Sequence, residues 1–328
     1  MKAVRIHHYG DESVLCYEEV SLPDLGPRDV LIRVAAASVN RADLSHRQGN
    51  YRGGISTNLP LVLGTDVAGV VEATGAKVRP EEARAGQRVL ALLSEGGYAE
   101  YVATHVAATQ PVPPSLPLEE AASIPVVFLT AWFALLLPDQ GALQREQTCL
   151  INAAGSGVGV AAIQIAKHLG ARVIASAGAD WKLEKAQALG ADAVINYATA
   201  DLAQAVYALT HGRGADMVLE LVGGPVYEQS LEAVAYGGRL VSVGRSSGDA
   251  SPADEGELIR RGVQVSSFAL PSQIPGGNAR RALGDLLALF QDGRLRAVVD
   301  RVFPLHEAAE AHRYLDARKN FGKVLLQP

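Results

Sequence analysis

The chain has 328 residues, about twice the roughly 150 residues of a typical domain, so two domains are expected. Hydrophobic residues make up 48% of the chain, charged residues 20%, and the net charge is -5, which excludes intrinsic disorder and gives no electrostatic basis for binding nucleic acid. The two cysteines, Cys16 and Cys149, lie far apart, which excludes a disulfide framework and a cysteine-built zinc site. They fit a reducing, cytoplasmic setting, and no secretory signal precedes the first strand-like run.

The N-terminal third contains short β-branched runs separated by glycine and proline, a pattern typical of a compact, mostly antiparallel β domain. The predicted strands are Lys2–His7, Val30–Ala36, Asp66–Thr74, Arg88–Leu93 and Tyr98–Ala103. Four prolines in Gln110–Pro117 disfavour helix there and predict a connection to a second domain. The apolar run Val126–Leu137 that follows is too short to cross a bilayer and is predicted to be a buried helix.

From Thr148 onward strands and helices alternate, which predicts an α/β fold with a doubly wound parallel sheet of six strands. The predicted strands are Thr148–Asn152, Arg172–Ser176, Ala193–Asn196, Met217–Glu220, Arg239–Val243 and Val263–Phe268. The predicted intervening helices are Gly157–Leu169, Asp180–Leu189, Asp201–Leu209, Tyr227–Ala235 and Asp254–Arg261. Four further elements do not continue this unit, and we expect them to fold back onto the first domain. These are a helix at Arg280–Gln291, a strand at Val298–Phe303, a helix at His306–Asp316 and a strand at Lys323–Leu326.

A glycine-rich loop lies between the first strand and the first helix of the parallel unit. A tight turn, close approach of a pyrophosphate and close helix packing each favour glycine, and free N–H groups at the helix start attract phosphate. Val160 occupies the sixth position of G-x-G-x-x-G, so the loop is a variant dinucleotide site; the alternative is a turn that only tightens a helix against the sheet. The predicted phosphate-binding residues are Ala154, Gly155, Ser156, Gly157, Val158 and Gly159.

The end of the second parallel strand indicates the cofactor. It reads Ser176-Ala177-Gly178 and offers no carboxylate to a ribose 2′-hydroxyl, as an NAD site would. The nearest acid, Asp180, is predicted to be the N-cap of the next helix. Lys182 in the first turn of that helix could reach a 2′-phosphate, although it could also be an ordinary solvated lysine. NADPH is therefore the predicted cofactor.

Seven segments together resemble the zinc-free quinone oxidoreductases, the zeta-crystallin-like branch of the medium-chain dehydrogenase/reductase superfamily. They are AAASVNRADL at Ala35–Leu44, LVLGTDVAGVVEATG at Leu61–Gly75, GGYAEYV at Gly96–Val102, PVVFLTAWFAL at Pro125–Leu135, NAAGSGVGVAAIQIAKHLGA at Asn152–Ala171, ALGADAVINY at Ala188–Tyr197 and FGKVLL at Phe321–Leu326. The resemblance implies a GroES-like catalytic domain over residues 1–124 and 269–328 and a Rossmann NADPH-binding domain over residues 125–268. It also implies a homodimer, with Val263–Leu270 as the candidate edge.

The same resemblance implies a set of cofactor contacts. Lys182, Tyr197 and Arg318 would surround the 2′-phosphate, where two cations and a phenol suit a dianion. The predicted cofactor residues elsewhere in the site are Asn40, Thr130, Ser176, Val243, Gly244, Phe268 and Leu270. Asn40 is also a catalytic candidate, although it could be a turn residue between strand and helix. Arg245 departs from the asparagine that the branch often has at that position.

The resemblance also indicates which metal ligands this sequence lacks. Zinc-dependent relatives carry a cysteine at the position of Asn40 and G-H-E at Gly64-Thr65-Asp66, and the eight histidines here form no metal-binding motif. We therefore predict no metal. Without a Lewis acid, dehydrogenation of simple alcohols is disfavoured, whereas a quinone or α,β-unsaturated carbonyl accepts hydride more easily. Tyr51 is the predicted proton donor or hydrogen-bond partner, or else an exposed aromatic residue in a glycine-rich loop.

The predicted function is NADPH-dependent reduction of a quinone. The first alternative is an enone or enoyl-thioester reductase, which would share the fold, the cofactor and the absence of zinc. The second is a non-catalytic NADPH-binding structural or RNA-contacting protein, which the acidic composition disfavours. The predicted partners are a small conjugated carbonyl or quinone substrate and a second copy of the chain, with neither nucleic acid nor membrane.

Overall fold

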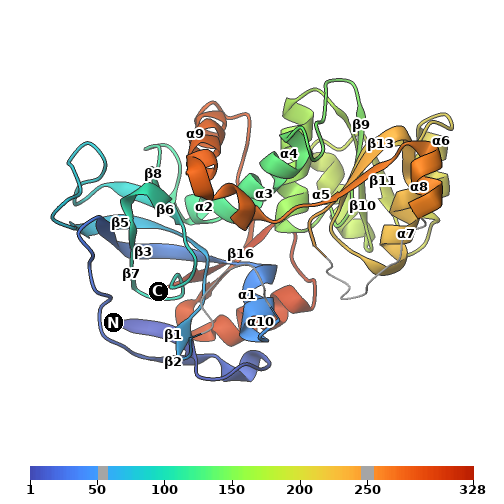
Figure 1. Cartoon of the computed structure of the whole chain (residues 1–328). Coiled ribbons are helices and arrows are strands. Elements are labelled where there is room, and N and C mark those ends of the chain that lie inside the picture. The colour runs from blue at the N-terminus through green and yellow to red at the C-terminus, as the bar shows by residue number, and fades with distance from the viewer. Residues whose placement is uncertain (51–57, 245–254) are drawn as a thin grey trace. The chain divides into compact units, whose positions relative to one another are not determined.

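The computed structural model describes residues 1–50, 58–244 and 255–328 of the chain (Figure 1). Tyr51 and Arg245 lie outside the described residues. The chain divides into two compact units, one formed by Met1–Leu129 with Pro271–Pro328 and the other by Thr130–Leu270. Helix α3 (Pro125–Leu136), the apolar run expected to be a buried helix, contains the boundary between them. Among the described residues, no helix has the length and apolarity needed to cross a bilayer.

The first unit contains two sheets. One has three strands in the order β2-β1-β4; in the other, the order is β15-β16-β3-β5-β6-β8, and β7 also pairs with β3. All the strand pairs are antiparallel except β15 with β16. The strands are β1 (Lys2–Ile6), β2 (Cys16–Glu19), β3 (Asp29–Val39), β4 (Leu61–Val62), β5 (Asp66–Thr74), β6 (Arg88–Leu92), β7 (Tyr101–His105), β8 (Thr109–Pro111), β15 (Val299–Pro304) and β16 (Lys323–Gln327).

The C-terminal segment completes the sheet of the first unit. Strand β16 pairs antiparallel with β3, with Val324 opposite Val39, although 285 positions separate the two residues in sequence (324 minus 39). The helices of this unit are α1 (Arg41–Arg47), α2 (Leu118–Ala122), α9 (Asn278–Gln291) and α10 (Ala308–Asp316). The pairing brings Lys323, the first residue of β16, to the end of β3 where Asn40 follows.

The strand expected at Tyr98–Ala103 was wrong at its start, because the chain changes sheets there. Tyr98 and Glu100 exchange backbone hydrogen bonds with β1 through Val4 and Lys2, whereas pairing with β3 begins only at Tyr101. Each partner satisfies different backbone groups, so one apolar run contributes to two sheets. The change leaves the Tyr98 side chain fully buried between them.

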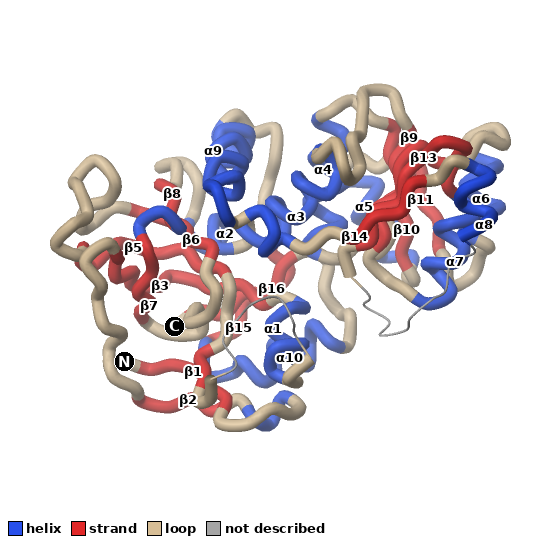
Figure 2. The backbone as a smooth tube through the Cα atoms, in the orientation of Figure 1, coloured by secondary structure: helices blue, strands red, loops and turns tan. Residues whose placement is uncertain are grey.

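The second unit is a parallel sheet in the order β11-β10-β9-β12-β13-β14. Helices α4 and α5 cover one face and α6, α7 and α8 the other (Figures 1 and 2). The strands are β9 (Thr148–Ile151), β10 (Arg172–Ala177), β11 (Ala193–Asn196), β12 (Ala215–Glu220), β13 (Val234–Ser242) and β14 (Gln264–Ser267). The helices are α4 (Gly157–His168), α5 (Asp180–Ala188), α6 (Leu202–Leu209), α7 (Gly224–Ala233) and α8 (Glu255–Arg261).

This sheet confirms the predicted fold class, a doubly wound parallel sheet accompanied by a mostly antiparallel β unit. The strand order runs outward from β9 in both directions, so the topological switch point lies between β9 and β12, where ligands bind such sheets at the carboxyl ends of the strands. The helix expected at Tyr227–Ala235 was wrong at both ends. It begins at Gly224, with a proline in its first turn, and stops at Ala233 because Val234 already pairs with Ala215 of β12.

Candidate active site and cofactor site

The glycine loop of the second unit ends in a capped helix. Ser156 is the N-cap of α4, and its hydroxyl accepts a hydrogen bond from the Gly159 N–H at 3.0 Å. A Cβ atom at Gly159 would lie 2.4 Å from the Ala153 carbonyl oxygen, so only glycine fits there. The N–H groups of Gly157 and Val158 belong to the first helical turn, which has no preceding carbonyls to accept them. This arrangement fits a pyrophosphate.

Three buried polar residues, Asn152, Ser176 and Ser230, form hydrogen bonds beside the glycine loop. The Ser176 hydroxyl donates to the Asn152 amide oxygen at 2.5 Å, and the Asn152 amide nitrogen donates to the Ser230 hydroxyl at 2.7 Å. The Ser176 carbonyl accepts the Ala154 N–H at 2.9 Å. Ser176, predicted to bind the cofactor, thus has its hydroxyl bonded inside the unit. Asn152 was not predicted as a functional residue, because its only signal in the sequence is an amide at the end of a largely apolar strand.

Two of the residues predicted to contact a 2′-phosphate lie at one edge of the parallel sheet, after the neighbouring strands β10 and β11. Tyr197 follows β11, and its ring lies against Gly178, where an added Cβ would be 3.0 Å from the ring. Lys182 lies in the first turn of α5, with its ammonium 5.2 Å from the centre of the Trp181 ring. Arg318 belongs to the first unit, where it is exposed and has a left-handed backbone with φ of 55°.

The expected N-cap at Asp180 was wrong. Ala179 is the N-cap of α5, and Asp180 is the first helical residue. Its carboxylate accepts a hydrogen bond from the Asn196 amide at 2.6 Å, which ties the start of α5 to the end of β11. Asp180, the acid that follows the end of β10 in the sequence, is therefore engaged with the neighbouring strand end.

The remaining predicted cofactor residues of the second unit lie close to the carboxyl ends of its strands or on α3. Val243 follows β13, and its N–H donates to the Glu220 carbonyl at 3.0 Å. Phe268 follows β14, is buried, and packs against Phe133 with ring centres 6.3 Å apart. Thr130 on α3 and Leu270 are also buried, whereas Gly244 is exposed.

Asn40 of the first unit is held between a cation and an anion. The Lys323 ammonium donates to the Asn40 amide oxygen at 2.6 Å, and the amide nitrogen donates to an Asp66 carboxylate oxygen at 2.8 Å. Lysine can only donate and an ionised carboxylate can only accept, so these two neighbours fix which end of the amide is oxygen. Burial lowers the pKa of Lys323, while the charges of Asp66 and Asp43 raise it.

A second buried chain of polar groups continues from the N–H of Asn40. The Asp43 carboxylate accepts hydrogen bonds from this N–H at 2.8 Å and from the Tyr98 hydroxyl at 3.0 Å. The Tyr98 oxygen lies 3.1 Å from Nε2 of His312, whose Nδ1 lies 3.2 Å from the Arg47 guanidinium. Burial raises the pKa of Asp43 to about 7, and burial with the nearby Arg47 charge lowers the pKa of His312 to about 3.

The groups around Asn40 do not fit zinc. Protein zinc sites use thiolate, imidazole and carboxylate ligands, but Asn40 and Thr65 offer an amide and a hydroxyl, and the Lys323 ammonium already contacts the amide oxygen. Across residues 1–50, 58–244 and 255–328, no three histidine, cysteine or acidic side chains are grouped to hold a metal ion.

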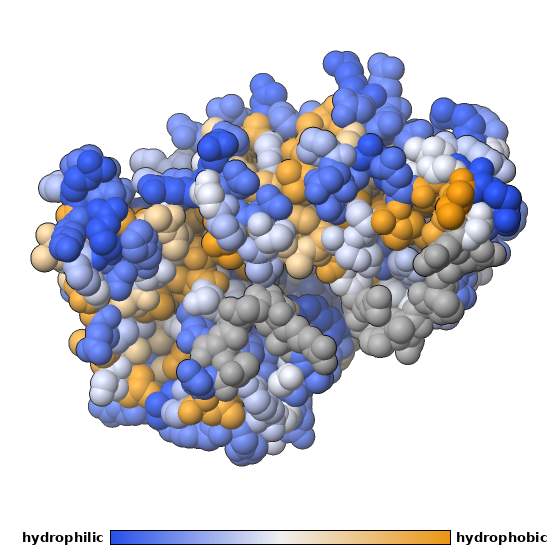
Figure 3. Space-filling view, viewed as in Figure 1, coloured by the Kyte–Doolittle hydropathy of each residue, from blue (hydrophilic) through white to orange (hydrophobic). Residues whose placement is uncertain are grey.

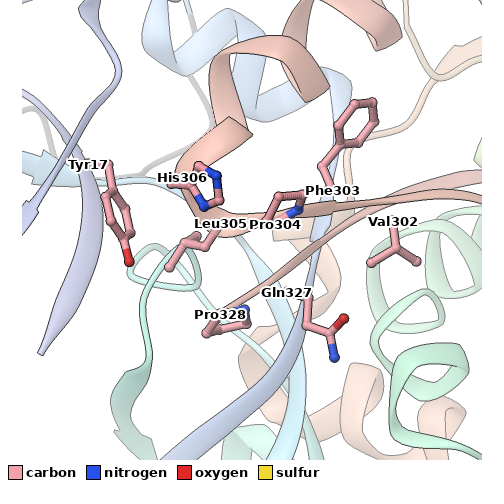
Figure 4. Close-up of a pocket in the computed structure, with 8 residues that line it drawn as sticks. All are labelled: Tyr17, Val302, Phe303, Pro304, Leu305, His306, Gln327 and Pro328. Carbon is pink, nitrogen blue, oxygen red and sulfur yellow. The ribbon is translucent and has the colours of Figure 1, made fainter.

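The first unit also has a pocket of about 330 Å³, drawn in Figure 4. The Tyr17 and His306 rings, 5.9 Å apart, stand at one side of it. None of its residues belongs to the predicted site. The lining residues are Tyr17, Val302, Phe303, Pro304, Leu305, His306, Gln327 and Pro328.

Comparisons with known proteins match both units. One family model, alcohol dehydrogenase GroES-like domain, matches residues 26–114, and another, zinc-binding dehydrogenase, matches residues 157–288. The chain is 33% identical to a quinone oxidoreductase of Pseudomonas aeruginosa over 100% of this chain and 99% of that protein. It is 31% identical to a 2-haloacrylate reductase of a Burkholderia species, over 99% and 98% of the two chains.

Solved structures agree over the whole chain. A quinone oxidoreductase of Escherichia coli complexed with NADPH matches with a TM-score of 0.93 and 29% identity, over 100% of both chains. A structure described as an NAD-dependent alcohol dehydrogenase matches with a TM-score of 0.90 and 37% identity, also over 100% of both chains.

Proposed function

Because the chain belongs to the medium-chain dehydrogenase/reductase superfamily, in its quinone oxidoreductase-like branch, we propose that this oxidoreductase uses NADPH to reduce a quinone. The observation that carries the proposal is the position of Lys182 and Tyr197 at one edge of the parallel sheet, where the Asp180 carboxylate is already bonded to Asn196. Such an edge suits the 2′-phosphate that distinguishes NADPH from NADH.

The residues that would hold the cofactor follow from the second unit. The first-turn N–H groups of α4 would bind the pyrophosphate, and Lys182 and Tyr197, with Arg318 of the first unit, would bind the 2′-phosphate. Val243, Gly244, Thr130 and Phe268 would line the nicotinamide half, together with Asn40 of the first unit, and Leu270 would be a further cofactor contact. When bound, NADPH supplies a hydride to the acceptor.

The described residues around Asn40 form no zinc-binding set, which favours a conjugated acceptor. Reduction of an isolated ketone places a full charge on one oxygen, which zinc enzymes stabilise with the metal. A quinone delocalises that charge over its ring, so hydrogen bonds are sufficient. In this proposal the enzyme works without zinc.

A second candidate is the reduction of an α,β-unsaturated carbonyl compound. The 2-haloacrylate reductase that matches over nearly its full length is named for such a substrate. The two reactions share the cofactor and the need for an oxygen-stabilising donor, so they differ only in the acceptor.

We also propose that two copies of the chain pair along β14. This strand has a partner, β13, on one side only, and Val265 is 39% exposed on it. Ile259 on the adjacent α8 is 79% exposed, and Figure 3 shows apolar surface in the region of α8. An edge strand presents unpaired backbone N–H and C=O groups along one side, which favours addition of another strand. A cytoplasmic setting stays the prediction made from the cysteines.

The test is a set of turnover measurements. The purified protein is mixed with NADPH, or with NADH as the control, and with quinones, enals, enones and an enoyl-thioester, and loss of NADPH absorbance is followed. We expect the highest kcat/KM with a quinone and NADPH. Faster reduction of enones or enoyl-thioesters would replace the first candidate with the second. Tight NADPH binding without turnover of any acceptor would refute both and favour a non-catalytic role.

A further inference from the structure

The neighbours of the Asn40 side chain fix the direction of its hydrogen bonds. Because Lys323 fixes the amide oxygen and Asp66 fixes the amide nitrogen, the nitrogen must also be the donor to the Thr65 hydroxyl oxygen, 3.2 Å away. The lone pair of an amide nitrogen is delocalised into the carbonyl, so this nitrogen can only donate, and Thr65 accepts the bond. The Thr65 hydrogen then remains available to another acceptor.

Thr65 is the one hydroxyl of this described network whose own hydrogen has no acceptor. The Ser38 hydroxyl donates to Asp66, and the Tyr98 hydroxyl donates to Asp43. Within the described residues, Thr65 makes no side-chain hydrogen bond other than the one it accepts from Asn40. A buried donor without a partner costs free energy, and an active site is a common reason to retain one.

The backbone holds Thr65 in place. Its carbonyl accepts the Leu93 N–H at 2.7 Å, and the next residue, Asp66, begins β5 and pairs with Leu92. The residue is buried but retains 8% exposure. A donor that is fixed before the reaction loses no energy in reorientation when charge develops.

We propose that the Thr65 hydroxyl donates a hydrogen bond to the carbonyl oxygen of the acceptor, and that Asn40 and Lys323 are positioning residues that orient and polarise it. The inference rests on the proposed function. As a carbon of the acceptor takes up the hydride, its displaced π electron pair moves onto that oxygen. The Thr65 hydrogen bond stabilises the oxyanion, and a proton from water then completes the reduction.

The Lys323 charge strengthens this donor through the chain of bonds. Its ammonium donates to the Asn40 amide oxygen and to the Val39 carbonyl at 3.0 Å, so it does not itself face the acceptor. Polarisation of the amide by a buried cation makes the amide N–H groups better donors, and Thr65 a better donor in turn. The Lys323 ammonium thus polarises the Asn40 amide at a site whose side chains do not fit zinc.

The kinetic test compares T65V with T65S. T65V keeps the shape and removes the hydroxyl, so kcat/KM for the best acceptor should fall about 10²-fold, while T65S should stay within a few-fold of wild type. The dissociation constant of NADPH should not change in either variant. T109V is the matched control, because Thr109 is buried in the same unit and its hydroxyl donates to the Val106 carbonyl at 2.8 Å.

A double-mutant cycle tests the positioning role. K323M should lower kcat strongly in the wild-type background and much less in the T65V background, because both changes remove the same stabilisation. K323R keeps the charge and should retain most of the activity. Equal fold-losses from K323M in both backgrounds would contradict the positioning role. Removal of Lys323 leaves the buried Asp66 and Asp43 without its nearby positive charge, which destabilises the fold. If K323M does not fold, the Thr65 variants alone test the proposed donor.

A binding measurement separates this inference from the proposed function. With saturating NADP⁺, 4-nitrophenolate imitates the oxyanion, and its absorbance reports binding without turnover. T65V should bind it about 10-fold or more weakly than wild type, and T65S nearly as well as wild type. Equal phenolate binding by wild type and T65V, including none by either, together with unchanged kcat/KM would overturn the inference. If the wild-type protein reduces no acceptor but T65V binds the phenolate more weakly than wild type, only the proposed function is refuted.

Discussion

Asp43 and His312 give the first unit two opposite pH dependences that cancel over most of the acidic range. The pKa of Asp43 rises from the ordinary 3.8 to about 7 through burial, so the folded chain holds a proton that the unfolded chain releases above about pH 4. The contribution of Asp43 to the free energy of unfolding is full below pH 4 and is lost as the pH rises to about 7. Its total size, at 1.4 kcal/mol per pKa unit, is about 4 kcal/mol.

His312 has the opposite sign. Its pKa falls from 6.5 to about 3, so the unfolded chain gains a proton below pH 6.5 that the folded chain refuses. Stability from this group is present above pH 6.5 and is lost as the pH falls towards 3. Between about pH 4 and pH 6.5 the two slopes, each about 1.4 kcal/mol per pH unit, should cancel. The charged groups near the pair are Arg47, Asp66 and Lys323.

The two contributions can be separated by substituting one titrating residue, His312 or Asp43, at a time. Relative to wild type, H312Q should lose about 1.4 kcal/mol of stability per unit as the pH rises from 4 to 6.5, whereas D43N should gain as much. Other titrating groups cancel in these differences. The assay is urea unfolding followed by far-ultraviolet circular dichroism, because both tryptophans, Trp132 and Trp181, belong to the other unit. Flat difference curves for both variants would refute the assignment of the two protons.

Three further changes address the cofactor and the assembly. Lys182→Ala should weaken NADPH about 10-fold and leave NADH almost unchanged, with Lys185→Ala on the same helix as the control; equal weakening of both cofactors in a fluorescence titration would argue against a 2′-phosphate contact. Gly159→Ala should weaken both cofactors alike by about 10-fold or more, because its Cβ would lie 2.4 Å from a carbonyl oxygen, and an unchanged affinity would mean that the loop adapts. Val265→Asp should turn a dimer into a monomer in light scattering, and a monomeric wild type would contradict pairing along β14.

The parallel unit could be predicted from sequence because its signals are local. Each buried strand reads as an apolar run, and the glycine loop lies directly between one strand and one helix. The errors came from contacts outside the local pattern. Aspartate is a residue type favoured at N-caps, so Asp180 was predicted as one. Instead, the Asn196 amide at the end of the next strand binds the Asp180 carboxylate, and Ala179 is the N-cap.

The polar network of the first unit could not be predicted in this way. Lys323 contacts Asn40 although 283 residues separate them, and the contact exists only because β16 pairs with the end of β3. In the sequence, Lys323 is one residue of a strand pattern. Thr65 is noted only because it stands where zinc-dependent relatives carry a histidine. Its hydroxyl gains a chemical meaning only when the direction of each neighbouring hydrogen bond is known.

The same network explains why a buried lysine is retained beside the proposed acceptor position. Burying Lys323 and Asp66 costs desolvation energy, and apolar replacements of buried ion pairs are often as stable or more stable. Stability alone therefore does not account for the pair. The two charges hold opposite ends of one amide, and this geometry leaves the Thr65 hydroxyl hydrogen without an acceptor among the described residues. A donor of this kind is weaker than zinc, so it can stabilise an oxyanion whose charge is delocalised but not the full charge of a simple alkoxide. Under the proposed function, a donor of this strength therefore favours a conjugated acceptor over a simple ketone.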